Sequence, residues 1–198
     1  MQFYPADAPV PTEYATQDLV LRVLRPEHVE IDYAAFMSSR ERLLVWSGGG
    51  WPAADFTLEQ NMDDMHRHED AYIGRTQFTF TVLNPDATMS EGCVYIDSWD
   101  AVLQNTTATP ESLGVGDYKG VATYWVRDSA LERDLDRQLL AGLRAWFKSD
   151  DWSFKRVVFR ANQDQVRDIQ VFEDAGLRPL YTVESSTDGS RVSFYGEE

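Results

Sequence analysis

The fold is decided by the stretch from Gly120 to Arg160, which reads GVATYWVRDSALERDLDRQLLAGLRAWFKSDDWSFKRVVFR. Its first residues, 120–127, form a mostly apolar run typical of a buried strand. Leucines then recur every four residues from Leu131 to Leu143, which predicts a helix that ends near Lys148. The run RVVFR at 156–160 predicts another strand. A strand, a helix and a strand in this order form a crossover, so we expect the two strands to be parallel.

Further strands and helices surround this crossover. In chain order we expect a strand at 18–24, a helix from Pro26 to about Trp46, a helix opened by Thr57, strands at 78–82 and 91–97, a helix at about 163–175, and strands at 180–184 and 191–195. Thr57 and Gln60 form a capping box, and Gly176 suits the left-handed end of a helix. The order predicts an α/β fold, a mixed twisted sheet of about six to seven strands with helices on both faces.

The length of 198 residues is typical of one domain. Residues 1–17 are rich in Pro, Ala and acidic side chains and lack periodicity, which predicts an N-terminal arm outside the core. We therefore divide the chain into this arm and a single domain at 18–198. The stretch 98–119 is rich in Thr, Asn, Gly and Pro and is long for a connection, which predicts a substrate loop or a disordered segment.

Composition excludes several functional classes. Hydrophobic residues make up 43% of the chain, which excludes a disordered protein, and the net charge of −15 would repel nucleic acid and anionic membranes. Cys93 is the single cysteine and there is no CxxC motif, so a disulfide framework and a thiolate zinc site are both excluded. With neither a secretion signal nor an apolar span in the sequence, we expect a cytoplasmic protein.

Histidines and glycines give little sign of catalytic chemistry. His66 and His68 are two residues apart on a predicted helix and so point in different directions, which disfavours a metal site. His28 stands alone without a nucleophile motif, so a histidine triad has no support. Gly48–Gly50 lack the flanking residues of a phosphate-binding loop and are interpreted as a connector. We expect no metal.

Two segments and the element order resemble the GNAT superfamily of acyl-CoA-dependent N-acetyltransferases. Val126 ends a strand, and apolar Leu135, Leu139 and Leu140 match positions after that family's pyrophosphate-binding loop. Residues 172–177, FEDAGL, are similar to its Tyr-Glu-x-x-Gly-Phe segment. The resemblance covers most of the chain from Asp18 onward. It implies acetyl-CoA as co-substrate, with its pyrophosphate at the backbone N–H groups after the strand and its pantetheine between the two parallel strands.

The loop departs from the family pattern. Leu131 takes the Arg or Gln position, and Glu132, Asp134 and Asp136 stand where glycines are common. A carboxylate 4 Å from a phosphate charge is repelled by about 1 to 4 kcal/mol. The pyrophosphate loop is therefore degenerate, although Arg127 and Arg133 could pair with phosphate oxygens. The same residues also allow a capping box formed by Ser129 and Glu132, which would satisfy the helix N–H groups internally. Both interpretations stay open.

The resemblance also implies site residues. Those expected to contact the cofactor are Trp125, Val126, Arg127, Arg133, Asp134, Asn162 and Phe172. Phe172 replaces the tyrosine that serves many relatives as general acid, so the acid is unknown. Asp97, at the end of a predicted central strand, is our candidate general base, because an amine must lose a proton before it attacks a thioester. A turn-forming Asp after a strand is the more ordinary interpretation of the same residue.

Two functions follow from this reading. The first is an N-acetyltransferase that moves acetyl from acetyl-CoA to the amine of a small molecule by direct attack, with residues 98–119 governing the choice of acceptor. The second is a catalytically inactive GNAT-like module for binding or dimerisation that has lost the pyrophosphate loop. A homodimer is compatible with either function.

Overall fold

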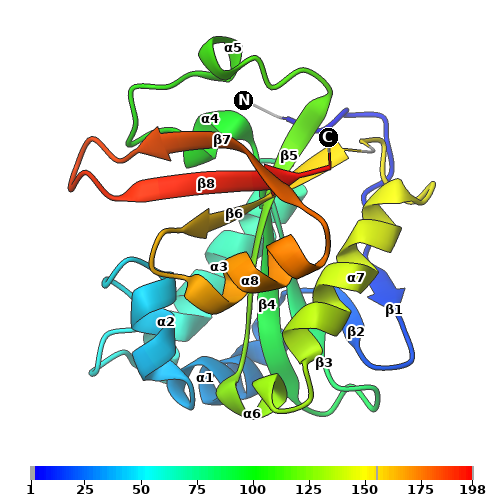
Figure 1. The fold of residues 1–198 in the computed structure, drawn as a ribbon. Helices are drawn as coiled ribbons and strands as arrows, with labels where there is room; N and C mark the ends of the chain where they lie inside the picture. The colour runs from blue at the N-terminus through cyan, green and yellow to red at the C-terminus, as the bar shows by residue number, and fades with distance from the viewer. Residues whose placement is uncertain (1–2, 155, 198) are drawn as a thin grey trace.

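A computed structural model describes residues 3–154 and 156–197, and it contains one mixed sheet (Figure 1). The eight strands lie in the order β1-β2-β3-β4-β5-β6-β8-β7. Their bounds are Glu13–Ala15 for β1, Val20–Val23 for β2, Gln77–Leu83 for β3, Ser90–Asp97 for β4, Tyr118–Val126 for β5, Arg156–Asn162 for β6, Arg178–Glu184 for β7 and Arg191–Gly196 for β8. The α/β class is confirmed, with more strands than the six to seven expected.

Helices cover both faces of the sheet, as expected. They are the 3₁₀ turn η1 at Pro26–His28, α1 at Val29–Met37, α2 at Arg40–Trp46, α3 at Leu58–Ile73, α4 at Trp99–Val102, α5 at Pro110–Leu113, α6 at Asp128–Leu131, α7 at Leu135–Lys148 and α8 at Val166–Asp174. In Figure 1, α7 and α8 pack on one face, while α1 and α3 pack on β4 and β3 from the other. Within the described residues, none of the helices is both long and apolar enough to cross a membrane.

The predicted crossover is confirmed. Strands β5 and β6 are parallel, and α7 connects them across the sheet. The leucines of α7 point into the larger core cluster, where Leu139, Leu143 and Trp146 are fully buried. Burying a leucine-sized side chain contributes about 1.5–3 kcal/mol, so this face of α7 fixes the helix on the sheet.

The local signals at helix ends and hairpins are also confirmed. Thr57 and Gln60 form the capping box at the start of α3. Gly176 follows α8 with φ of +82°, the left-handed conformation that favours glycine. Strands β3 and β4 pair antiparallel, as do β7 and β8. These features depend on residues close together in sequence.

The N-terminal arm differs from the expectation. Residues 13–15 add the edge strand β1 to the sheet, pairing antiparallel with β2. Tyr4 is 2% exposed and packs in the core, with its ring centroid 5.3 Å from that of Phe78. Its hydroxyl donates a hydrogen bond to the carbonyl of Pro9. A single aromatic side chain therefore anchors a segment that carries no periodic signal.

Two helices that the sequence predicts as continuous are interrupted. The first divides into α1 and α2 at Ser38 and Ser39, where the Ser38 hydroxyl donates to the carbonyl of Ala35. The helix after β5 divides into α6 and α7, because Asp134 takes a left-handed conformation with φ of +55°. Aspartate tolerates this conformation better than most residues. Both breaks lie at the candidate site described below.

The stretch 98–119 forms two short helices, α4 and α5, rather than an unstructured loop. Ser98 caps α4 by accepting a hydrogen bond from the N–H of Ala101. Trp99 is buried, and its indole N–H donates to the carbonyl of Tyr118 at 2.9 Å. Thr106 forms a bridge to Ser185 beside β7. The polar composition of this stretch gave no sign of these hydrogen bonds or of the buried Trp99.

Candidate active site at the separation of β5 and β6

Strands β5 and β6 separate halfway along their length. Their paired register runs from Tyr118 opposite Arg156 to Ala122 opposite Phe159 and goes no further. Beyond this point the two parallel strands are not paired, over residues 123–126 of β5 and 160–162 of β6. These unpaired residues form the carboxyl ends of both strands. In open α/β sheets this edge is where ligands bind. The separation supplies the expected place for a cofactor tail.

The chain turns sharply just beyond β5. Asp134 precedes α7, and its left-handed φ is the conformation that a glycine at this position would take readily. The predicted capping box of Ser129 and Glu132 does not form, since α6 begins one residue earlier and the N–H of Asp128 donates to the Ser39 hydroxyl at 2.8 Å. The loop thus keeps a glycine-like backbone while carrying acidic side chains.

A carboxylate of the chain itself lies at the start of α7. Asp136 is 1% exposed and accepts hydrogen bonds from Arg167 Nε at 2.6 Å and from the N–H of Arg137 at 3.0 Å. Arg167 also contacts Asp134 at 3.4 Å. The bond to Asp136 raises the pKa of Arg167. Because the positive end of a helix favours an anion, Asp136 occupies a position that a phosphate would otherwise find favourable.

Helix α2 lies against the separated strand. The indole N–H of Trp46 donates to the carbonyl of Tyr124 at 2.8 Å, and Arg42 donates to the carbonyl of Val126. Arg42 also pairs with Asp128 at 2.6 Å. These strand carbonyls are therefore already satisfied. The arrangement does not fit a pantetheine chain hydrogen-bonded along this part of β5 unless α2 first releases its contacts.

Asn162 of β6 also holds α2 against the gap between β5 and β6. Its side-chain amide donates to the carbonyls of Val45 and Trp46 at 3.2 and 3.1 Å. The residue therefore faces the gap, as the resemblance implies, but its present partner is the end of α2. Helix α2 is therefore held by backbone carbonyls of β5, by the side chain of Asn162 on β6 and by the Asp128 carboxylate of α6.

A cavity of about 290 Å³ lies beside this closure, and we call it the central cavity. It is lined by Leu24, Asp32, Trp46, Ser47, Trp51, Asn61, Asp64, Met65, His68, Tyr95, Asp97 and Thr123. Thr123 is the first residue of β5 beyond its pairing with β6. The cavity thus reaches β5 at the point where the gap between β5 and β6 begins, and Trp46 lies between the cavity and this gap.

Asp97, the predicted general base, lines the central cavity. It ends β4, and its carboxylate accepts a hydrogen bond from Gln77 Nε2 at 2.7 Å. Burial raises the pKa of Asp97, while Gln77 and the nearby Arg160 act in the opposite direction. A raised pKa brings a carboxylate closer to the range in which it accepts and releases protons near neutral pH. This placement is compatible with the role of general base.

Sequence reasoning missed Asp32 and the active-site position of His68. Asp32 on α1 is 4% exposed, and its carboxyl accepts a hydrogen bond from Asn61 at 3.2 Å. Burial raises the pKa of Asp32 to about 7. His68 lies within hydrogen-bond distance of Gln77 and Thr79, and burial lowers its pKa. Only the apolar flanks of Asp32 in the sequence hinted that this acid is buried.

The raised pKa of Asp32 predicts a pH-dependent cost in stability. Between about pH 4 and pH 7, the folded chain keeps a proton on Asp32 that the unfolded chain has lost. The stabilisation that the protonated Asp32 contributes below pH 4 is therefore lost as the pH rises through about 7. Asp32→Asn cannot ionise and should be more stable than the wild type at pH 8 by on the order of 1–3 kcal/mol, with a smaller difference at pH 5. Urea unfolding at both pH values measures this.

The control for this measurement is Asp100→Asn, which removes an exposed acid from α4. It should leave the free energy of unfolding nearly unchanged at both pH values. A stability difference between Asp32→Asn and wild type that is equal at pH 5 and pH 8 would contradict the assignment of this titration to Asp32.

The other residues implied by the resemblance have structural partners. Arg133 pairs with the buried Glu91 at 2.9 Å, and Arg127 donates to the Ser38 hydroxyl at 3.3 Å. Trp125 is buried, and its indole N–H donates to the Tyr95 hydroxyl at 3.3 Å. Phe172 is 2% exposed and packs its ring 6.0 Å from that of Tyr124. Phe172 is therefore part of the core, and Arg133, whose side chain is about half exposed, is already paired with a carboxylate of the chain.

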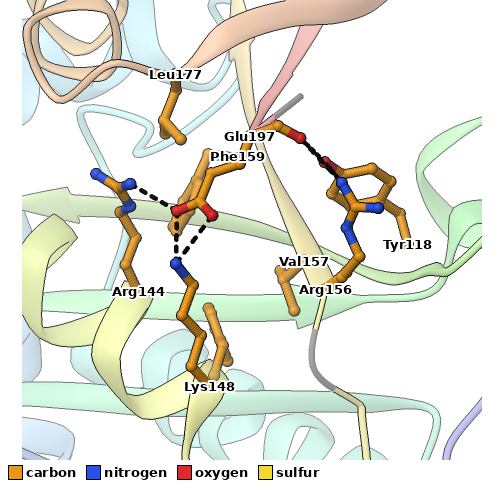
Figure 2. Close-up of a pocket in the computed structure, with 9 residues that line it drawn as sticks. Tyr118, Arg144, Lys148, Arg156, Val157, Phe159, Leu177 and Glu197 are labelled. Atoms are coloured by element: carbon orange, nitrogen blue, oxygen red, sulfur yellow. Dashed lines mark hydrogen bonds and ion pairs between the residues drawn. The ribbon is translucent and has the colours of Figure 1, made fainter.

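A smaller pocket of about 70 Å³ lies on the α7 side of β6, away from the central cavity (Figure 2). The Glu197 carboxylate reaches into it and binds Arg144 at 2.6 Å and Lys148 at 2.7 Å. These hydrogen bonds lower the pKa of Glu197, with Lys148 the larger cause. The basic side chains are neutralised by Glu197, so these ion pairs fasten the end of the chain to α7.

No cluster of three or more His, Cys, Asp or Glu among the described residues is arranged to hold a metal.

No protein-family model matches the sequence, and no curated protein matches it. Solved structures do. The microcin C7 self-immunity acetyltransferase MccE, solved with acetyl-CoA and AMP, matches with a TM-score of 0.69 at 12% identity, over 92% of this chain and 93% of that one. The chain has the GNAT fold. An acetyltransferase of the GNAT family from Bacillus anthracis matches with a TM-score of 0.63 at 12% identity, over 93% of this chain and 97% of that one.

A third matching acetyltransferase structure also carries a coenzyme. RimL, a ribosomal L7/L12 alpha-N-protein acetyltransferase solved with coenzyme A, matches with a TM-score of 0.67 at 13% identity, over 95% of this chain and 96% of that one. At these identities the likeness establishes the fold. The separation of β5 and β6, the α2 contacts and the acidic turn are observations on this chain's own structure.

Proposed function

We propose that the protein is an acetyl-CoA-dependent N-acetyltransferase whose acceptor is the amine of a small molecule. The observation that carries the proposal is the position of the central cavity, which meets β5 at Thr123, where β5 leaves β6. An acceptor in this cavity would lie beside the gap that receives the thioester in the resembling family. The cavity volume of about 290 Å³ suits a small molecule.

Acetyl-CoA supplies an acetyl group already activated as a thioester. The residues of this chain must then hold the amine and take its proton. Asp97 lines the cavity and ends β4, so its carboxylate is our candidate for the group that takes the proton. The ammonium form of the acceptor gives one proton to Asp97, the amine nitrogen bonds to the acetyl carbon, and the carbon–sulfur bond breaks. The second proton that the nitrogen loses goes to the departing sulfur, which leaves as the thiol. Helix α2 has to release Tyr124 and Val126 for the thioester to approach.

A thiol-release assay tests the proposal. The protein is incubated with millimolar acetyl-CoA and a panel of primary amines, and free thiol is measured against reactions that lack either the amine or the protein. Thiol release that requires both, together with the acetylated amine in mass spectrometry, supports the function. No release above hydrolysis with any amine, and no heat of acetyl-CoA binding, would leave a non-catalytic binding module as the function.

A further inference from the structure

We propose that the central cavity is a binding site for a small organic ammonium ion, held by an aromatic cage with carboxylate side chains around it. This deepens the proposed function, since it names the charge and class of the acceptor, and it rests on that function where it calls the ligand an acceptor. The cage consists of Trp46, Trp51 and Tyr95, which all line the cavity.

The aromatic rings come from three separate segments. The ring centroid of Trp46 lies 6.5 Å from that of Trp51 and 5.9 Å from that of Tyr95. Trp46 ends α2, Trp51 lies in the following loop, and Tyr95 comes from β4. The planes of these two pairs are inclined by 62° and 37°, so the rings are not stacked face to face, and all three residues line the cavity. A cation within about 6 Å of a ring centroid is attracted by the negative face of the ring.

The charged lining of the cavity is acidic. Asp32, Asp64 and Asp97 line it, and none of the described residues of the lining is Lys or Arg. Asp64 is paired with Arg67, so its charge is already balanced, and Arg160 lies near Asp97. The part of the Asp97 charge that Arg160 leaves unbalanced and the Asp32 carboxyl, when ionised, therefore favour a positive ligand.

Desolvation reinforces this preference. The groups that face the Asp32 carboxyl are Asn61 of α3, and Cys93 and Tyr95 of β4, and none of them is a cation. His68 has a pKa lowered by burial, so it adds no positive charge at neutral pH. The carboxylates and aromatic rings of the lining would attract a cation. A neutral ligand of the same shape would lack this electrostatic attraction, and an anion would be repelled by the carboxylates.

Tetramethylammonium is the probe that separates this inference from the proposed function, because it cannot be acetylated. Its neutral match in size and shape is tert-butanol. Titration of both into the full-length protein, followed by shifts of the tryptophan indole N–H signals in NMR, should show saturable binding of tetramethylammonium and weaker or no binding of tert-butanol. Equal binding of the two probes, or no binding of tetramethylammonium, overturns the inference.

Two variants locate the binding. Trp51→Leu removes one ring of a half-buried side chain and should weaken tetramethylammonium binding by about 2- to 30-fold. Asp97→Asn keeps the shape of the side chain and should weaken it about fivefold or more. Asp86→Asn removes an exposed acid from the turn between β3 and β4, outside the cavity, and should leave the affinity unchanged. Unaltered affinity in both cavity variants, with thermal unfolding showing that they are folded, overturns the inference.

The two proposals fail independently. Acetylation of amines by a protein that does not bind tetramethylammonium refutes the cage and leaves the transferase. Binding of tetramethylammonium by a protein that releases no thiol with any amine refutes the transferase and leaves a cation-binding module.

Discussion

Asp97→Asn is expected to lower kcat/KM for amine acetylation by about 10²- to 10⁴-fold, the range for loss of a general base. The change keeps the shape of the side chain, and the hydrogen bond donated by Gln77 can persist. It removes only the group that takes the proton. Steady-state thiol release with the best amine of the panel measures the loss.

The pH profile distinguishes a base from a structural aspartate. Burial raises the pKa of Asp97, and the carboxylate must be ionised to accept a proton, so wild-type kcat/KM should fall as the pH drops through this raised pKa. Asp97→Asn should lose that limb of the profile. The control Asp86→Asn, in the turn between β3 and β4, should keep both rate and profile. A rate for Asp97→Asn within about threefold of wild type would remove Asp97 from the mechanism.

The double variant Arg42→Ala/Trp46→Phe is expected to bind acetyl-CoA about 30-fold more tightly than the wild type. It removes the donors that α2 offers to the carbonyls of Val126 and Tyr124 and keeps a ring at position 46. One neutral and one charged hydrogen bond together contribute about 2 kcal/mol or more, which corresponds to this factor. Calorimetric titration of acetyl-CoA measures the change.

Glu41→Ala is the matched control for this prediction, because Glu41 is an exposed residue on the same helix and takes no part in the β5 contacts described above. It should bind acetyl-CoA as the wild type does. Weaker binding by the double variant than by the wild type would show that Arg42 and Trp46 contribute to the cofactor site instead of closing it.

Much of the fold follows from local sequence patterns. The crossover from β5 to β6, the capping box at Thr57 and the left-handed Gly176 each depend on residues within a few turns of one another. Periodicity and capping chemistry report such short-range order directly. The packing of the N-terminal arm was harder to predict, because Tyr4 packs against Phe78, which lies far along the chain. The same arm supplies β1, the strand that the sequence did not predict.

The candidate site was predictable only in part. Asp97 was found because it ends a strand, a position that sequence can indicate. The contact of Trp46 with Tyr124 spans 78 residues, and the bond of Arg167 to Asp136 spans 31. No local pattern predicts which helix will lie in a gap between strands or which arginine will neutralise a buried acid. Such pairings follow from the packing of the whole chain.

Hydrogen–deuterium exchange of the wild type with and without saturating acetyl-CoA tests most directly whether the gap between β5 and β6 receives the cofactor after α2 withdraws. We predict faster exchange in α2, residues 40–46, and slower exchange at 123–126 and at the start of α7. Unchanged exchange in all three segments at saturating acetyl-CoA, or protection confined to another part of the chain, would contradict the account.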